Sequence, residues 1–173
     1  MDNAIHWHDG VFATLKKTGI RQVAYVPDAG HTRLITLCRA DAGLYTIPLT
    51  TEEEGVAMLA GAWLGGERGV LLMQSSGVGN CINMLAMIQE CRLPFLTLIT
   101  MRGEWGEFNP WQVPMGQAMD KLLQDAGVIV QRVEDVESLV DTVNAAAHLA
   151  FDAHRAVAVL ISQRIIGFKN WQK

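Results

Sequence analysis

The residue best placed to do chemistry is Glu52, the first of three consecutive glutamates in the segment TTEEEG. The spacing of apolar residues predicts a helix that begins just before it. On this helix it lies above an apolar stripe formed by Val56, Leu59 and Trp63. A carboxylate in that position needs a specific hydrogen-bond partner. The alternative is an ordinary acid in the first helical turn, where the helix dipole favours a negative charge.

The two following glutamates have a structural explanation that Glu52 lacks. A helix capped by Thr50 places Glu53 three positions further on, which is the spacing of a capping box. A helix capped by Thr51 places Glu54 at the same spacing. Either arrangement leaves Glu52 available for another role.

A second candidate segment is QSSGVGN, residues 74–80, which joins an apolar run to a helical one. A glycine turn of this kind could present backbone N–H groups to an anion at the start of a helix. It is not a dinucleotide-binding fingerprint, because the position of the third glycine is Ile82. The sequence also lacks the GxxxxGK pattern of a P-loop. The alternative is a plain tight turn without a ligand.

Two more unusual segments follow apolar runs, VPDAGH at residues 26–31 and TMRGEWGEFNPWQ at residues 100–112. The second contains Trp105, Phe108 and Trp111. These are more aromatic side chains than a free loop needs. We therefore expect them to pack on a partner chain or to close over a site.

Short β-rich runs alternate with helical stretches along the chain. We expect strands over residues 22–26, 44–49, 69–73, 94–100, 128–131 and 156–161. We expect helices over residues 4–18, 30–40 (capped by Asp28), 50–64, 78–89, 117–125 and 136–152. This alternation indicates an α/β fold, a doubly wound and mostly parallel six-stranded sheet with helices on both faces. Ligands bind at the carboxyl ends of such strands, and all four unusual segments fall at that edge.

The composition indicates one folded domain over residues 1–173. Half of the residues are hydrophobic, and the formal net charge of -4 argues against a nucleic-acid-binding protein. Three cysteines without a CxxC pair indicate reduced thiols. No hydrophobic leader or membrane-spanning run is evident, so we expect a cytoplasmic protein without a membrane partner. His6 and His8 lack the context of metal ligands, so we expect them at the surface and no metal site in this chain.

The run from Thr51 to Asn80 resembles the pyrimidine-binding domain of thiamine-diphosphate enzymes. It combines a glutamate nine residues before the glycine of AGAWL with a later MQSSGVGN. It looks most like the branch of phosphonopyruvate and sulfopyruvate decarboxylases, because VPD and RGE followed by NPWQVPMG also resemble that branch. The likeness covers essentially the whole chain and implies the fold of that domain.

The resemblance implies a catalytic role for Glu52. In the family, a glutamate hydrogen-bonds N1′ of the cofactor's aminopyrimidine and promotes the tautomer that removes the proton from C2 of the thiazolium. The activated cofactor then releases CO2 from a 2-oxo acid. Glu52 matches this glutamate by its nine-residue distance to Gly61, whereas Glu53 and Glu54 do not.

The resemblance also implies binding residues. The turn near the cofactor's pyrimidine comprises Gly77, Val78, Gly79 and Asn80. His31 could face the substrate as a donor or acid, and Arg102 could pair with an anionic group of the substrate. The alternatives are an exposed histidine at a helix start and an arginine in a structural salt bridge of the loop. Gln112 is a third substrate-binding candidate, on the same loop as Glu107 and Asn109.

The resemblance further implies a partner. In the family, thiamine diphosphate is held through Mg2+ by a separate domain with a GDG motif and a downstream Asn, and this sequence contains no GDG. Sulfopyruvate decarboxylases can be split into an alpha chain and a beta chain, and this sequence resembles such an alpha chain. We therefore expect a hetero-oligomer in which a beta subunit binds the diphosphate and Mg2+. The small-residue helix at 55–62 and the aromatic loop are the candidate interfaces.

Several alternatives stay open. The segment after RGE reads WGEFNPW, which carries less charge than in related chains, so the substrate could be a small 2-oxo acid without a phosphono or sulfo group. The chain could also be a carboligase subunit or a non-catalytic regulatory or binding module on the same fold. A further hypothesis is that the chain is an unrelated doubly wound domain that binds a nucleotide or an acyl group through QSSGVGN.

Overall fold

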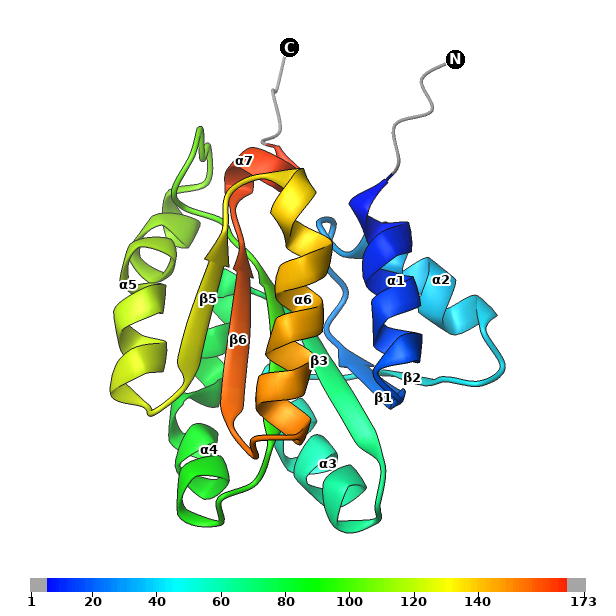
Figure 1. The fold of residues 1–173 in the computed structure, drawn as a ribbon. Helices are drawn as coiled ribbons and strands as arrows, with labels where there is room; N and C mark the ends of the chain where they lie inside the picture. The colour runs from blue at the N-terminus through cyan, green and yellow to red at the C-terminus, as the bar shows by residue number, and fades with distance from the viewer. Residues whose placement is uncertain (1–5, 168–173) are drawn as a thin grey trace.

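The structure is a computed structural model, and residues 6–167 are described. Its centre is a six-stranded sheet in the order β2-β1-β3-β4-β6-β5, in which every neighbouring pair is parallel (Figure 1). The strands are β1 (Ile20–Tyr25), β2 (Tyr45–Pro48), β3 (Arg68–Gln74), β4 (Phe95–Thr100), β5 (Ile129–Val133) and β6 (Ala156–Ile161). The expected α/β fold with a doubly wound parallel sheet is confirmed.

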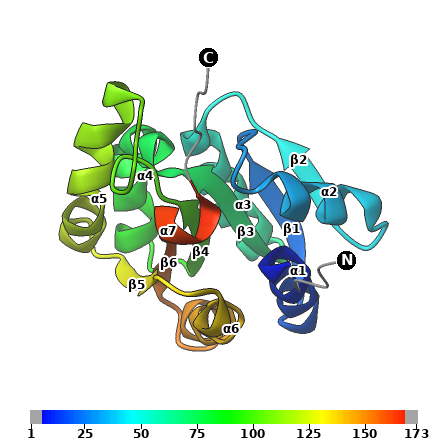
Figure 2. The same cartoon turned by 90° about the horizontal axis from the view of Figure 1, so that it is seen from above.

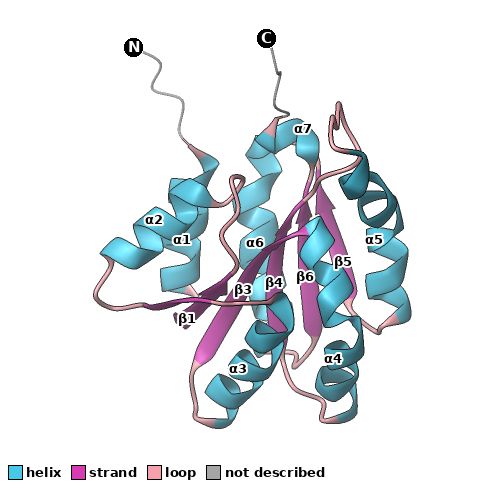
Figure 3. Ribbon diagram, turned by 180° about the vertical axis from the view of Figure 1, so that it is seen from behind, coloured by secondary structure: helices cyan, strands magenta, loops and turns pink. Residues whose placement is uncertain are grey.

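Helices cover both faces of the sheet (Figures 1 and 2). One face carries α1 (Trp7–Lys17), α2 (Thr32–Ala40) and α6 (Val136–Phe151). The opposite face, seen in Figure 3, carries α3 (Glu52–Leu64), α4 (Val78–Glu90) and α5 (Val113–Asp125). A short helix, α7 (Gln163–Ile166), follows the last strand.

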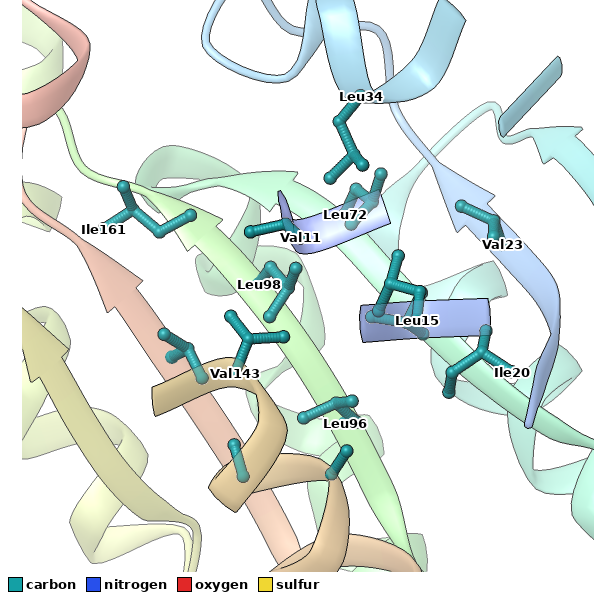
Figure 4. Close-up of a cluster of buried hydrophobic side chains, with 14 of the residues drawn as sticks. Val11, Leu15, Ile20, Val23, Leu34, Leu72, Leu96, Leu98, Val143 and Ile161 are labelled. Carbon is teal, nitrogen blue, oxygen red and sulfur yellow. The ribbon is translucent and has the colours of Figure 1, made fainter. Parts of the chain in front are cut away.

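Each face of the sheet has its own hydrophobic core, and the central strands supply both cores with alternate side chains. In β3, Val70 and Leu72 belong to the core under α1 and α6, whereas Leu71 and Met73 belong to the core under α3 and α4. This alternation is the two-residue period of a strand that is buried on both faces. Figure 4 shows part of the first core, where Val11 and Leu15 of α1 lie near Leu72 and Leu98.

The sequence places most elements correctly, with errors at their ends. Strand β6 has the predicted bounds, but α5 begins at Val113 rather than at residue 117, because Pro114 fits the first helical turn. Helix α2 begins at Thr32, and α7 was not predicted. The first residues of the helix predicted over 4–18 lie outside the described residues.

The strand order creates a switch point between β1 and β3 at the carboxyl edge of the sheet. After β1 the chain moves outward through α2 to β2, and after β2 it crosses back through α3 to β3. The chain leaves β3 in the other direction, toward β4. The loops that follow β1 and β3 therefore diverge, and such a point is the usual binding crevice of an open parallel sheet.

Candidate functional site

Glu52 is the first residue of α3, and only 8% of its surface is exposed. The predicted stripe is buried at Val56 and Leu59, whereas Trp63 is only partly buried and packs against the core on the other face of the sheet. Helix α3 starts beside the switch point, because β2 ends at the carboxyl edge of the sheet. The carboxylate of Glu52 is thereby held where the crossover helix meets the binding edge.

The expected capping box does not form. Thr51 is the N-cap of α3, but its side chain makes no capping hydrogen bond. Its hydroxyl donates to Glu53 instead, and Glu54 accepts a hydrogen bond of 2.9 Å from the backbone N–H of Thr50. Glu53 and Glu54 thus form hydrogen bonds with the residues just before the helix, and Glu52 takes no part in these bonds.

The carboxylate of Glu52 lies between two residues of the glycine turn. Nδ2 of Asn80 donates to Oε2 of Glu52 over 2.8 Å. A Cβ built on Gly77 would lie 2.1 Å from Oε1 of Glu52, so the carboxylate occupies the space that any other residue at 77 would fill. Within residues 6–167, Oε1 accepts no hydrogen bond. The site therefore presents one carboxylate oxygen that is fixed and one that is available.

The other two residues of the turn differ in their surroundings. Val78 is fully buried in the core under α3 and α4, so neither its side chain nor its backbone is exposed in this chain, unlike the cofactor contact that the resemblance implied. Gly79 is exposed, and a Cβ built on it would lie 3.3 Å from the methyl group of Met115. The lack of a side chain at Gly77 thus lets the turn before α4 approach Glu52. The lack of a side chain at Gly79 lets α4 approach Met115 of α5.

Cys81 is a buried thiol on the first turn of α4. Burial, together with the negative charges of Glu52 and Glu53, raises its pKa to about 12. Its Sγ donates weakly to the carbonyl oxygen of Gly77 over 3.7 Å. The thiol is neutral at ordinary pH, so it is not a thiolate nucleophile beside the glutamate.

Asp28 is the centre of a second polar cluster, which the sequence did not predict. It does not cap α2, whose N-cap is His31. Its carboxylate accepts hydrogen bonds from Nε2 of Gln74, over 2.9 Å, and from the hydroxyl of Thr100. Ser76 donates in turn to Oε1 of Gln74. These bonds join the ends of β1, β3 and β4 across the switch point.

His31 is fully buried, so the alternative of an exposed histidine at a helix start is wrong, and the predicted contact of His31 with a substrate is not visible in this chain. Its Nε2 lies 3.1 Å from the carbonyl oxygen of Leu98, and its Nδ1 has no hydrogen-bond partner in the described part of the chain. Burial lowers the pKa of the ring, which the charge of Asp28 opposes. The ring is therefore neutral at ordinary pH and is covered by protein.

His8 also differs from its expected surface position. Its ring stacks on Trp7 with centroids 3.5 Å apart, and its Nε2 lies 3.0 Å from the carbonyl oxygen of Gly30. It is half-buried, and burial lowers its pKa. His6 is exposed as expected. Among residues 6–167, no cluster of His, Cys, Asp or Glu could hold a metal ion.

Arg102 forms a two-pronged ion pair with Glu107 inside the loop after β4. Nε and Nη2 of the arginine each donate to one carboxylate oxygen over 2.6 Å. The guanidinium holds the pKa of Glu107 down at about 2, and the carboxylate raises the pKa of Arg102. The loop salt bridge that the sequence left as an alternative is therefore present, while Nη1 stays without an acceptor in the described residues.

The rest of this loop is held against the start of α5. The side chain of Asn109 accepts a hydrogen bond from the backbone N–H of Trp111 and so caps the short 3-10 turn Pro110–Gln112. The buried side-chain Oε1 of Gln112 has no partner in the described chain. A Cβ built on Gly103 would lie 2.2 Å from the backbone oxygen of Gln112, so the two chain segments are in close contact.

Large apolar side chains are exposed on the loop after β4 and on helix α3. Trp105 and Phe108 are about half exposed, and Trp111 is 86% exposed. Leu64, at the far end of α3, is 77% exposed. A Cβ built on Gly61 would meet no atom within 4 Å, so the outer face of α3 is open in this chain.

No helix among the described residues is long and apolar enough to cross a membrane.

Gln163 and Glu104 are two further residues that sequence reasoning missed. Glu104 accepts hydrogen bonds from the backbone N–H of Gln163 and from Ser162, and it pairs with Arg132 of β5. These residues lie far apart in the chain. Glu104 belongs to the RGE segment, but no local motif marks Gln163. Only the alignment of β4, β5 and β6 at one edge brings them together.

A scan of protein-family models finds none that matches this chain. Three curated relatives align over most of both chains. The sulfopyruvate decarboxylase subunit alpha of Methanococcus maripaludis is 31% identical over 154 residues, 88% of this chain and 92% of the relative. The subunit of the same name from Methanocaldococcus jannaschii is 32% identical over 151 residues, 87% of this chain and 89% of the relative.

Longer proteins match with a smaller share of their length. The phosphonopyruvate decarboxylase of Streptomyces viridochromogenes is 35% identical over 147 residues, which are 83% of this chain and 35% of that protein. Among solved structures, a 2-oxoglutarate:ferredoxin oxidoreductase from Magnetococcus marinus superposes with a TM-score of 0.77 and 19% identity. The match covers 94% of this chain and 29% of the oxidoreductase, and it shows the shared fold alone. Because the identity to the alpha subunits extends over nearly their whole length, this chain belongs to the family of sulfopyruvate decarboxylase alpha subunits.

Proposed function

We propose that this chain is the alpha subunit of a two-component, thiamine-diphosphate-dependent decarboxylase that acts on sulfopyruvate or a closely similar 2-oxo acid. In this proposal residues 1–173 form one pyrimidine-binding domain. The observation that carries it is the buried carboxylate of Glu52, which Asn80 and Gly77 hold with one free oxygen at the switch point of the sheet. The alpha-subunit relatives support the same activity by their names.

The residues around Glu52 fit the aminopyrimidine ring of thiamine diphosphate. Oε2 is committed to Asn80, so Oε1 is left to share a proton with a ring nitrogen. Gly77 keeps side-chain atoms away from this oxygen, and Gly79 and Asn80 offer an exposed backbone and an amide next to it. When bound, the cofactor supplies a ring system that accepts the electron pair of the broken carbon–carbon bond as CO2 leaves.

Glu52 has two tasks in this proposal. It positions the ring through a hydrogen bond, and it takes up or returns the proton of the ring nitrogen. A nearly buried carboxylate suits this work, because water competes poorly for the bond. Asn80 keeps the carboxylate in one orientation, so that Oε1 rather than Oε2 faces the ligand.

Arg102 is the proposed contact for an anionic group of the substrate. It lies after β4, and its charge interacts with Asp28 at the switch point. Its Nε and Nη2 are committed to Glu107, which leaves the N–H groups of Nη1 for a sulfonate or carboxylate oxygen. Gln112 is the second proposed contact, because it lies on the same loop and the N–H groups of its side-chain amide can donate to an anion. His31 lies beneath this site and does not contact the substrate in this proposal, because its ring is covered by protein.

A beta subunit is the proposed partner, and it would bind the diphosphate and Mg2+. The relatives are named as alpha subunits, which supports a second chain. Helix α3 is apolar on its outer face as well, where Ala57, Gly61 and Leu64 are exposed. A helix that is apolar on all sides is normally covered, and the same helix begins with Glu52. A partner that covers α3 would therefore reach the site. We also propose a cytoplasmic location, which the three unpaired cysteines support.

The test is reconstitution. This chain is purified with a candidate partner that carries the GDG motif, and CO2 release from sulfopyruvate, phosphonopyruvate and pyruvate is measured with thiamine diphosphate and Mg2+. We expect release only when both chains are present. A complex that binds the cofactor and releases no CO2 from any of the three acids would contradict the decarboxylase assignment.

A further inference from the structure

Gln163 is a buried amide at the first position of α7, and only 1% of its surface is exposed. Gln163 follows β6, and Arg102 lies on the loop that follows the neighbouring strand β4. We propose that Gln163 is a positioning residue for the substrate: it fixes Glu107, and Glu107 in turn orients the guanidinium of Arg102. This inference rests on the proposed function, which assigns Arg102 to an anionic group of the substrate.

The single amide of Gln163 holds the loop at three points. Its Oε1 accepts hydrogen bonds from the backbone N–H groups of Glu104, over 3.1 Å, and Trp105, over 3.0 Å. Its Nε2 donates to Oε2 of Glu107 over 2.9 Å. An amide is needed here, because the position requires an acceptor on one atom and a donor on the other.

Glu107 is the hub through which this restraint reaches Arg102. Its side chain is 3% exposed and accepts hydrogen bonds from Arg102, Gly103, Asn109 and Gln163. The first three of these donors belong to the same loop, so they would move with Glu107. Gln163 is the donor that belongs to a different strand connection, and it ties the hub to the rest of the fold.

The loop after β4 is also held by contacts that do not involve the side chain of Gln163. The effect of Gln163 on Arg102 can therefore be distinguished from an effect on folding of the loop. The hydroxyl of Ser75 accepts a hydrogen bond of 3.0 Å from the backbone N–H of Arg102. Glu104 pairs with Arg132 of β5 and accepts from the backbone N–H of Gln163. None of these contacts uses the side chain of Gln163, so they remain when that side chain is changed. Loss of the Gln163 amide should therefore alter the direction of the Arg102 side chain while the loop stays attached.

Two substitutions separate the chemistry of the amide from its volume. Gln163→Met keeps the length of the side chain and removes both hydrogen-bonding atoms. Gln163→Glu keeps the shape and the acceptors but places a carboxylate against Glu107. The charged groups around position 163 are Glu104, Glu107 and Arg102 from the loop, Arg132 from β5, and Arg164 from α7, which lies over the ring of Trp105. The adjacent carboxylates raise the pKa of the introduced acid, so it gains a proton, and the donor function, as the pH falls.

The experiment uses the complex with the partner chain and measures KM and kcat for sulfopyruvate at several pH values. We expect Gln163→Met to raise KM about tenfold at every pH while kcat changes less than about twofold. We expect Gln163→Glu to raise KM similarly at about pH 8 and to approach the wild-type KM toward about pH 6. A second measurement follows the labelling of Arg102 by phenylglyoxal with peptide mass spectrometry. Labelling should increase in Gln163→Met, because the guanidinium is less firmly held.

The matched controls are Gln22→Met and Gln22→Glu. Gln22 also donates from its amide to a glutamate, Glu67, but it lies at the amino end of β1, on the opposite edge of the sheet. Both control variants should keep the wild-type KM and the wild-type labelling of Arg102. Unchanged labelling in Gln163→Met would overturn the proposal, and so would increased labelling with an unchanged KM. A wild-type complex without activity would instead overturn the proposed function, and the labelling would still decide whether Gln163 fixes Arg102.

Discussion

The carboxylate of Glu52 and the Cα of Gly77 are in direct contact: a Cβ built on Gly77 would lie 2.1 Å from Oε1 and 2.3 Å from Cδ of Glu52. The two residues come from different crossovers, the start of α3 and the turn after β3. A glycine at 77 is therefore a condition for the position of the glutamate, even though its backbone conformation is one that other residues adopt readily.

This contact predicts that Gly77→Ala destabilises the protein by about 1–3 kcal/mol and displaces the carboxylate. The cost should disappear largely in a Glu52→Ala background, because all three atoms nearest to the added Cβ belong to Glu52. Urea unfolding of the two single variants and the double variant measures the coupling. Strictly additive changes would show that the added methyl group meets something other than Glu52.

Asn80 fixes Oε2 of Glu52 by a hydrogen bond of 2.8 Å. We expect Asn80→Ala to lower kcat of the reconstituted complex about tenfold, because the free carboxylate can rotate away from the ligand. Asn83→Ala is the matched control, since Asn83 is an exposed asparagine about one turn further along α4. Equal activity of the two variants would exclude a role for the Asn80 bond.

The ion pair between Arg102 and Glu107 predicts a dependence of stability on pH. The pKa of Glu107 falls from its ordinary value of 4.5 to about 2, chiefly through the hydrogen bonds from Arg102. The stabilisation is therefore complete above pH 4.5 and is lost as the pH falls from 4.5 toward 2. The difference in the free energy of unfolding between wild type and Glu107→Gln should shrink over this range.

The measurement is urea unfolding of both proteins at a series of acidic pH values. Asp135→Asn is a useful comparison, because Asp135 caps α6 far from the loop and its pKa is also lowered. A difference between wild type and Glu107→Gln that stays constant from neutral pH to about pH 2 would contradict the assigned ion pair.

The exposure of Trp111 predicts a role in assembly. This side chain is 86% exposed in the isolated chain, so Trp111→Ala should change its free energy of unfolding by less than about 0.5 kcal/mol. The same substitution should weaken co-purification with the beta subunit, because a large aromatic side chain next to the site is a typical interface anchor. Val136→Ser, at another exposed apolar residue, should leave co-purification unchanged. A loss of stability in the isolated chain would show that Trp111 packs within its own fold.

The sequence predicted what local patterns determine. The apolar runs predicted the sheet, because strands that are buried on both faces must be apolar throughout. The stripe below Glu52 predicted its burial, and the position of QSSGVGN after a strand predicted its place at the binding edge. The proposed role of Glu52 rests on the resemblance to a family. The start of α5 differs from the prediction because Pro114 fits the first helical turn instead of the loop.

The contacts that cross the sheet could not be predicted. Asp28 was interpreted as a helix cap, but its partners are Gln74 and Thr100, which approach it only after β1, β3 and β4 pair. Gln163 had no visible motif, because its importance depends on the position of Glu107 in space. Burial of His31 likewise follows from the packing of α1 and α2 over the strand ends, which no local pattern encodes.

The most direct test of the account is Glu52→Gln in the complex with the partner chain. The amide keeps the shape of the side chain but cannot take up a proton, so we expect CO2 release to fall at least about a hundredfold while the unfolding transition stays near that of wild type. Glu54→Gln, two residues along the same helix, should retain most of the activity, because the carboxylate of Glu54 accepts a hydrogen bond from the backbone N–H of Thr50 and, within residues 6–167, from no other group. Near wild-type CO2 release from the Glu52→Gln complex would contradict the central claim.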